Sequence, residues 1–399
     1  MRYIQLQDLN DLEGIIVSIE ALLKRVNNRE LSNEVQEVLA IASDQLNNSL
    51  FMSVNLDWDC VIPDYDEMYA NDRSKQIEAM LPVWKLSLER RRGLQIDSEF
   101  WSLYEYFKYV NRDAIISNAM AIFQSYTENY QRQFTSLPQR YTFLTGKLDI
   151  EQNDYSLIPI YVDMMKAEVE NFKWLYNKLA DYRSKQVLIR IVRFWFTFDL
   201  NDLGDLHENI FKDYFDLDLL SCDENEIMVD CGAYVGDSVL DYIHTWGGRY
   251  RKIYAYEISP DTMNQMQQNL EKYENIIFRQ KAVGSMQAKM YLDEETEGAG
   301  ARITQTGKIC VEVVPLDEDI EEPVSIIKMD IEGAERDALI GAQRHIVQDR
   351  PRLLVCTYHK PEDLFQIPRL IESMRDDYAY YLRFNGRGIW PCDHVLFAV

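Results

Sequence analysis

Two acids and two glycines stand close together in the stretch IMVDCGAYVGDSV, residues 227–239. An apolar run ends at Asp230, Gly232 and Gly236 frame a short turn, and Asp237 follows the second glycine. Glycine tolerates positive φ and lets a ligand approach the backbone closely, and a helix that starts after the turn would offer free N–H groups. The pattern is GxxxG between acids and lacks the dinucleotide fingerprint GxGxxG, so it favours a cationic ligand without phosphates.

A third acid, Glu257, ends the next apolar run in YAYEISP. A carboxylate at that place can accept hydrogen bonds from both hydroxyls of a ribose. NAD-dependent oxidoreductases use the same arrangement, and a solvated acid at a strand end is the structural alternative. The glycine spacing decides between the cofactors, because S-adenosylmethionine carries a sulfonium and an ammonium group and no phosphate.

A second acidic turn follows in IIKMDIEGAERDALIGA, residues 326–342. The acids there could serve the dipole of a helix that starts after Gly333. Alternatively, Asp330 and Glu332 face the cleft in which a methyl group is transferred. His359 follows another strand end, and an ordinary pKa near 6.5 makes it a candidate general base. Asp330 is the other candidate, alone or orienting a histidine, and a purely structural His359 stays open.

A hard cation would need several convergent oxygen ligands. Asp317, Asp319 and Asp330 are the candidate set in this chain. The first two belong to LDEDIEEP, an acidic run typical of a solvated loop or a helix start. The sequence therefore predicts no metal.

These side chains need a scaffold of alternating strands and helices, which the chain predicts after about residue 220. Such alternation indicates a mostly parallel, doubly wound α/β sheet. The last two strands have no helix between them, which predicts a terminal antiparallel hairpin typical of a class I (Rossmann-like) methyltransferase. The expected strands are 226–232, 252–257, 276–283, 308–316, 325–330, 352–358, 378–384 and 394–399, and the expected helices are 236–246, 260–273, 333–348 and 361–376.

The first half of the chain shows helical periodicity instead, with apolar residues three and four apart over 12–26 and 161–179. An aromatic-rich segment lies within one long helix expected from Asp97 toward Phe134. We therefore expect an all-α domain over residues 1–205, ahead of the cofactor domain over 206–399. The helical domain could contact a partner, recognise the acceptor or form a homodimer.

Composition excludes some function classes. The formal net charge of −24 disfavours nonspecific binding to nucleic acid, which needs a basic surface. No apolar run reaches the length of a membrane span. Six scattered cysteines without a CxxC pair indicate a reduced, cytoplasmic chain.

Five motifs occur in a characteristic order, namely VDCGAYVGDS, YAYEISP, VPLDEDI, IIKMDIEGAE and YHKPEDLFQIPRLI. Over roughly residues 210–399 they closely resemble the FkbM family of S-adenosylmethionine-dependent methyltransferases. The resemblance implies a class I methyltransferase fold, S-adenosylmethionine as cofactor, and O-methylation of a hydroxyl on a sugar, glycan or natural-product intermediate.

The same resemblance assigns individual residues. Glu257 would hold the ribose, Ile258 and Ala282 would border the adenine, and Asp330, Glu332 and His359 would form the catalytic group. Arg302 and Lys360 are assigned to the acceptor. The residues expected around the methionine moiety are Asp230, Gly232, Ala233, Gly236 and Asp237.

One loop departs from the family pattern. In EGAGARITQTG, residues 297–307, Ala299 and Ala301 stand where relatives often carry serines, although Arg302 is retained. This loop and the large helical half motivate a second hypothesis, a methyltransferase-like binding or assembly protein with reduced catalysis. An NAD-dependent oxidoreductase, the third hypothesis, fits the alternating elements but not the glycine spacing.

Overall fold

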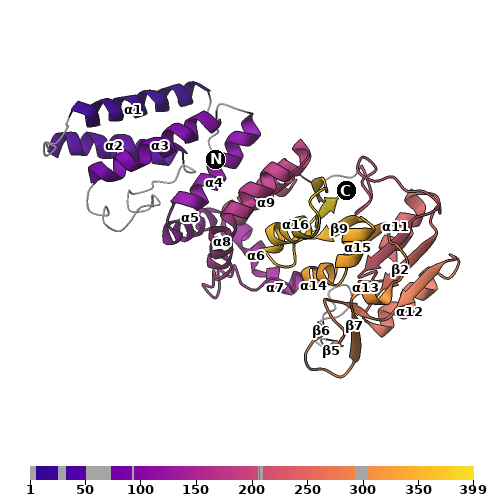
Figure 1. The fold of residues 1–399 in the computed structure, drawn as a ribbon. Coiled ribbons are helices and arrows are strands. Elements are labelled where there is room, and N and C mark those ends of the chain that lie inside the picture. Colours follow the sequence, from indigo (N-terminus) through magenta and orange to yellow (C-terminus); the bar gives the residue numbers. More distant parts are fainter. Residues whose placement is uncertain are drawn as a thin grey trace. The chain divides into compact units, whose positions relative to one another are not determined.

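A computed structural model describes residues 6–25, 33–50, 73–91, 94–204, 206, 210–292 and 303–399 (Figure 1). Contacts divide the chain into two compact units. Unit 1 comprises Met1–Thr127, Tyr155–Tyr176 and Trp195–Phe198, and unit 2 comprises Glu128–Asp154, Asn177–Phe194 and Asp199–Val399. The domain boundary expected near residue 205 stays a prediction. No helix in the described part of the chain is long and apolar enough to cross a membrane.

Unit 1 is helical, as the periodicity predicted. Its first three helices pack on one another through buried apolar side chains such as Ile19 and Trp84. The indole N–H of Trp84 donates to Asn47 Oδ1 over 2.9 Å, which satisfies a buried polar group. The helices are α1 (Leu6–Arg25), α2 (Asn33–Leu50), α3 (Arg73–Arg91), α4 (Gln95–Tyr109), α5 (Arg112–Ser125) and most of α8 (Leu157–Lys178).

The single long helix expected from Asp97 toward Phe134 is wrong. Helix α4 ends before Val110, whose backbone is extended, and α5 begins after Asn111, whose side chain accepts a hydrogen bond from the Ala114 N–H over 2.8 Å. An asparagine N-cap of this kind starts a new helix. A third helix, α6 (Glu128–Thr135), follows. The aromatic segment is buried as core, and Phe100 stacks on Tyr176 with ring centroids 3.8 Å apart.

Unit 2 is built around a seven-stranded sheet in the order β10-β11-β9-β8-β1-β2-β3. The five strands from β9 to β3 are parallel, whereas β11 runs antiparallel to both β9 and β10. The predicted terminal hairpin is therefore confirmed. The strands are β1 (Ile227–Cys231), β2 (Lys252–Tyr256), β3 (Ile276–Arg279), β8 (Ile326–Met329), β9 (Arg352–Cys356), β10 (Tyr380–Phe384) and β11 (His394–Ala398).

Helices cover this sheet. Every residue of β1, β8 and β11 is buried, as expected for strands covered on both faces. Helices α11 (Asp237–Thr245) and α12 (Pro260–Asn269) pack on one face, where Tyr242 and Met266 meet Met228 and Phe397. Figure 1 shows α14 (Glu335–Ile340), α15 (Gln343–Gln348) and α16 (Asp363–Met374) grouped beside β9. The single helix expected over 333–348 is therefore two.

A second, four-stranded sheet has the order β4-β7-β5-β6. The run 276–283, expected as one strand, divides between the two sheets, because β3 ends at Arg279 and β4 (Ala282–Val283) pairs with β7 (Cys310–Val314). Two strands were not predicted, β5 (Ala288–Leu292) and β6 (Ile303–Thr304). Neither contains a fully buried residue, so neither shows the alternation of buried apolar and exposed polar residues that marks a longer strand.

The first turn of α9 (Tyr182–Thr197) and the residues just before it cover the edge strand β10. The Ala180 N–H donates to Tyr380 O over 2.9 Å, and the Leu382 N–H donates to Ser184 Oγ over 2.9 Å. An exposed edge strand is a template for unwanted pairing. These hydrogen bonds cover the outer edge of β10 and so protect the sheet of unit 2 from such pairing. The remaining short helices of unit 2 are α7 (Leu137–Arg140), α10 (Asn201–Gly204) and α13 (Leu316–Asp319).

Candidate functional site

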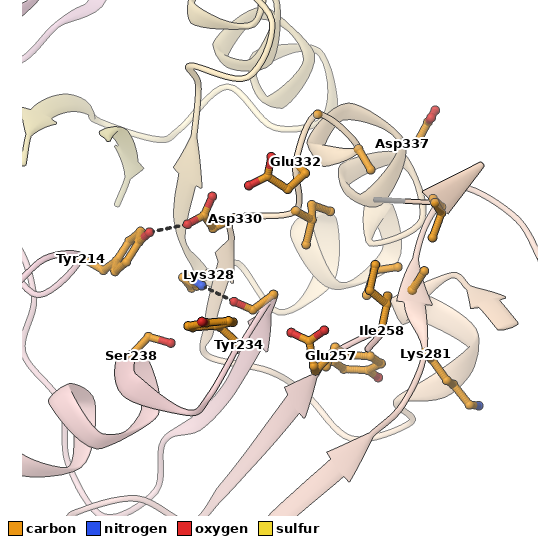
Figure 2. A pocket seen from close by; sticks show the side chains of 18 of the residues that line it. Tyr214, Tyr234, Ser238, Glu257, Ile258, Lys281, Lys328, Asp330, Glu332 and Asp337 are labelled. Carbon is orange, nitrogen blue, oxygen red and sulfur yellow. Dashed lines mark hydrogen bonds between the residues drawn. The ribbon is translucent and has the colours of Figure 1, made fainter. Parts of the chain in front are cut away.

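A cavity of about 490 Å³ lies at the carboxyl ends of β1, β2 and β8 (Figure 2). Ligands of open α/β sheets bind at this edge, and the volume lies in the usual range for small-molecule sites of about 300–1,000 Å³. The cavity is lined by Asp213, Tyr214, Gly232, Tyr234, Asp237, Ser238, Asp241, Tyr256, Glu257, Ile258, Lys281, Ala282, Val283, Met290, Ile303, Lys328, Asp330, Ile331, Glu332, Gly333, Ala334, Asp337 and Lys360.

The glycine turn forms one wall. Gly232 has a φ of 82°, and a Cβ at this position would lie 1.9 Å from Asp330 O, so only glycine fits. Gly236, with a φ of 84°, starts α11, and a Cβ there would lie 2.9 Å from Leu270 Cδ1. Gly232 and Asp237 line the cavity. Gly236 and Ala233 do not, and they shape the turn from behind.

Asp230 does not line the cavity and is fully buried. Its Oδ1 lies 3.0 Å from Lys328 Nζ, and its Oδ2 accepts a hydrogen bond from Ser238 Oγ over 2.5 Å. Lys328 Nζ also donates to Gly232 O over 2.8 Å, which ties β8 to the glycine turn. Burial lowers the pKa of Lys328, but Asp230 and Asp330 raise it above its usual range, so the lysine stays charged.

The role of Lys328 was missed by the sequence analysis. A lysine inside the apolar strand IIKM was the available signal, because buried lysines are almost always paired. Asp230 is paired with this lysine and does not line the cavity. The carboxylates that line it belong to Asp213, Asp237, Asp241, Glu257, Asp330, Glu332 and Asp337.

Glu257 lies directly after β2 and is 7% exposed. One carboxylate oxygen accepts the N–H of Ser259 over 2.8 Å. Burial raises the pKa of Glu257, although backbone N–H groups of Ser259, Ile258 and Tyr234 oppose this rise. The second sheet supplies an apolar wall beside it, in which Ile258 and Ala282 pack with Met290 and Ile303. The site can therefore hold polar hydroxyls beside an apolar planar group.

Asp330 follows β8 on the opposite wall. Its two oxygens accept hydrogen bonds from Tyr214 over 2.7 Å and from Tyr358 over 3.1 Å. Burial raises its pKa, but Lys328 and His359 outweigh this and leave the pKa below its usual value. Asp330 is therefore an ionised carboxylate in a fixed orientation. Neither tyrosine was predicted, although Tyr358 precedes His359 in the YHKPEDL motif.

His359 lies behind Asp330 and Glu332 and does not line the cavity. Its side chain is 1% exposed, with Nδ1 2.9 Å from Glu335 Oε1 and Nε2 3.4 Å from Asp330 Oδ1 and 3.5 Å from Glu332 Oε1. Burial lowers its pKa, but Glu335, Glu332 and Asp330 raise it well above 6.5. A protonated imidazole has no lone pair for a proton, so this geometry disfavours His359 as the general base.

The other expected residues lie in different places. Lys360 lines the cavity and donates to Gly333 O. Arg302, with Ala299 and Ala301, lies outside the described residues. Asp317 accepts the N–H groups of Arg344 and His345, and Asp319 pairs with Lys281 over 2.8 Å and with Arg279 over 3.0 Å. These two acids stabilise loops and do not join Asp330.

Residues 230–382 match the family model of the methyltransferase FkbM domain. A crystal structure of methyltransferase FkbM from Methylobacillus flagellatus KT is 20% identical, with a TM-score of 0.54 over 97% of this chain and 100% of that chain. An rRNA methylase from Streptococcus thermophilus is 16% identical (TM-score 0.29, 45% of this chain and 89% of that chain). Aeropyrum pernix fibrillarin with natively bound S-adenosyl-L-methionine is 13% identical (TM-score 0.29, 44% and 67%). No curated protein matches the sequence.

Proposed function

We propose an activity from one finding: residues 230–382 of this chain match the family model of the FkbM methyltransferase domain, which supports a methyltransferase. In this proposal the chain transfers the methyl group of S-adenosylmethionine to a hydroxyl oxygen of a sugar, glycan or natural-product intermediate. The predicted family resemblance and class I fold are confirmed. The cofactor, the atom methylated and the acceptor class are the proposed part.

The position of Glu257 carries the proposal. Its buried carboxylate stands between the glycine turn and an apolar wall, which is where an adenosine needs a partner for its ribose hydroxyls. Ile258 and Ala282 would contact the adenine, and Gly232 and Asp237 would hold the methionine moiety. When bound, S-adenosylmethionine supplies an electrophilic methyl group on a cationic sulfur.

The lysines of the cavity support an acceptor without negative charge. Each contacts an oxygen of the protein: Lys281 contacts Asp319, Lys328 contacts Asp230, and Lys360 contacts Gly333 O. Seven carboxylates share the cavity with these three lysines. A phosphate or carboxylate on the acceptor would be repelled, whereas a hydroxyl can donate a hydrogen bond to an ionised acid.

The transfer forms a bond between the acceptor oxygen and the methyl carbon, breaks the bond between that carbon and sulfur, and releases the hydroxyl proton. Asp330 is the carboxylate placed to accept that proton or its hydrogen bond, and Tyr214 and Tyr358 fix its orientation. Because its pKa is lowered, Asp330 is a weak base. Alignment must therefore supply much of the rate, and in ideal cases it is worth about 7–11 kcal/mol.

Calorimetric titration with S-adenosylhomocysteine tests the proposal, with NADH as the parallel control. We expect the first ligand to bind, and Glu257→Ala to abolish binding while circular dichroism stays unchanged. Binding of NADH alone would revive the oxidoreductase hypothesis. A folded protein that binds neither ligand would contradict the proposed cofactor.

A second candidate is a methyltransferase-like binding or assembly protein with reduced catalysis. The observation that favours it is the surroundings of the expected catalytic group. His359 is buried among carboxylates that raise its pKa well above 6.5, and the lowered pKa of Asp330 makes that carboxylate a weak base. Binding of S-adenosylmethionine without methyl transfer to any member of a broad panel of sugars and glycans would favour this candidate. Transfer to one member rejects it.

A further inference from the structure

One histidine in unit 2 is enclosed by carboxylates. Glu335 contacts Nδ1 of His359, and Asp330 and Glu332 contact Nε2. Neither ring nitrogen makes a hydrogen bond of good geometry, although the ring is almost completely buried. Oε2 of Glu335 is likewise buried without a partner. Three acids around such a ring call for a positive charge at their centre. The proton of the imidazole supplies that charge, and a metal ion that displaces this proton to water would supply it as well.

We propose that Asp330, Glu332 and His359 bind a divalent metal ion at the cavity wall, with Glu335 orienting the imidazole. The site itself stands on these residues alone. Its role in methyl transfer rests on the function proposed above. It differs from the oxygen-only set of Asp317, Asp319 and Asp330, because Asp317 and Asp319 pair with other residues.

The distances suit shared coordination. A metal lies about 2.0–2.2 Å from nitrogen and oxygen ligands, so two ligands of a tetrahedral ion stand about 3.3–3.5 Å apart. His359 Nε2 lies 3.4 Å from Asp330 Oδ1 and 3.5 Å from Glu332 Oε1. Asp330, Glu335 and His359 can each offer a ligand atom within 4.8 Å of the others. An ion bound at Nε2 would therefore be within reach of both carboxylates.

The backbone positions each donor. Glu332 adopts a φ of 56° in the turn after β8, an uncommon conformation for glutamate that brings its carboxylate to the cavity wall. Figure 2 shows Asp330 and Glu332 on the same side of the cavity. On the other edge of the ring, Glu335 Oε1 is held by the Ile331 N–H over 2.9 Å. A carboxylate behind a metal-bound histidine orients the ring in this way.

The chemistry favours a first-row ion such as Mn²⁺ or Zn²⁺. One imidazole nitrogen with carboxylate oxygens suits these ions better than Ca²⁺, which takes oxygen ligands only. Positions left open on the ion would face the cavity. An acceptor hydroxyl bound there would lose its proton more readily, and the proton would pass to water. This would compensate for the lack of a strong base.

Titration of the full chain with Mn²⁺, followed by the loss of the free-ion electron paramagnetic resonance signal, tests the site. We expect one tight ion per chain, displaced by Zn²⁺. His359→Ala should abolish binding, and Glu335→Gln should weaken it about 10–100-fold. Asp337→Asn removes a cavity acid outside the cluster and should leave binding unchanged.

Two further variants keep the outcome decisive. If His359→Ala fails to fold, Glu332→Gln tests the same site through a less buried side chain, and we expect weaker Mn²⁺ binding. Glu257→Ala should lose S-adenosylhomocysteine and keep Mn²⁺, so failure of the cofactor proposal is distinguishable from failure of the metal site. No saturable Mn²⁺ or Zn²⁺ binding by the folded chain, or equal binding by Glu332→Gln, would overturn the inference.

Discussion

Replacing Lys328 by methionine removes the counter-charge of a fully buried aspartate. In the native chain, Asp230 Oδ1 lies 3.0 Å from Lys328 Nζ, and both side chains are at most 3% exposed. Methionine is unbranched and only one atom shorter than lysine, so the main effect is an uncompensated charge in the core. Breaking a buried pair by removing one partner costs roughly 3–5 kcal/mol. We expect a loss of unfolding free energy of that size, which is a large part of the usual total of about 5–15 kcal/mol.

A double-mutant cycle isolates the pair. Asp230→Asn alone leaves Lys328 buried against Gly232 O, and it should cost a similar amount. The double variant should cost clearly less than the sum of the two, because replacing both charges removes the unpaired ion. The matched control is Lys252→Met, whose partner Glu322 and own side chain are 21% and 31% exposed. A more exposed pair of this kind is worth about 0–1 kcal/mol.

Urea denaturation of the full chain measures these changes. Tryptophan fluorescence and circular dichroism should both be recorded, because the chain has two compact units and coincident transitions are the test for unfolding in one step. A Lys328→Met loss below about 1 kcal/mol would refute the reasoning, since it would mean that Asp230 is solvated or neutral without its lysine. Strict additivity in the double variant would equally show that the two groups are not coupled.

Three other changes give separate predictions. Gly232→Ala places a Cβ 1.9 Å from Asp330 O and should abolish S-adenosylhomocysteine binding in calorimetry, whereas Gly247→Ala, at a positive φ with open space, should not. Tyr214→Phe removes a hydrogen bond to the Asp330 carboxylate and should lower the rate of methyl transfer about 10–100-fold, because hydrogen bonds to charged groups are worth about 1.5–3 kcal/mol. Unchanged turnover in a variant that still binds the cofactor would contradict the role of Asp330. Burial, followed by the charge of Glu335, raises the pKa of Asp363 from 3.8 to about 7. The protonated Asp363 side chain favours folding below pH 4, and this contribution to the unfolding free energy is lost as the pH rises to about 7. Asp363→Asn should therefore be more stable than the native chain at pH 8, by up to about 4 kcal/mol, and equally stable at pH 4. Denaturation curves at the two pH values measure this difference.

Local patterns determined much of this protein. The period of apolar residues predicted a helical first half and a second half of alternating strands and helices. The spacing of GxxxG predicted the turn after β1. The acids at the ends of the apolar runs predicted a binding site at one edge of the sheet, because the carboxyl ends of parallel strands lie at the same edge. Glu257, Asp330 and Glu332 all line the cavity, and their roles in binding and catalysis stay predictions. Such features depend on residues close in sequence, so the chain alone specifies them.

Only the tertiary structure decided what these groups are paired with. Lys328 neutralises Asp230 almost one hundred positions away, and Tyr214 reaches Asp330 from before the first strand. The enclosure of His359 by acids raises the pKa of the expected base and motivates the proposed metal site. Each of these outcomes depends on burial and on distances across neighbouring elements. Those quantities arise when the sheet assembles, because charges removed from water interact over a few ångströms regardless of their separation along the chain.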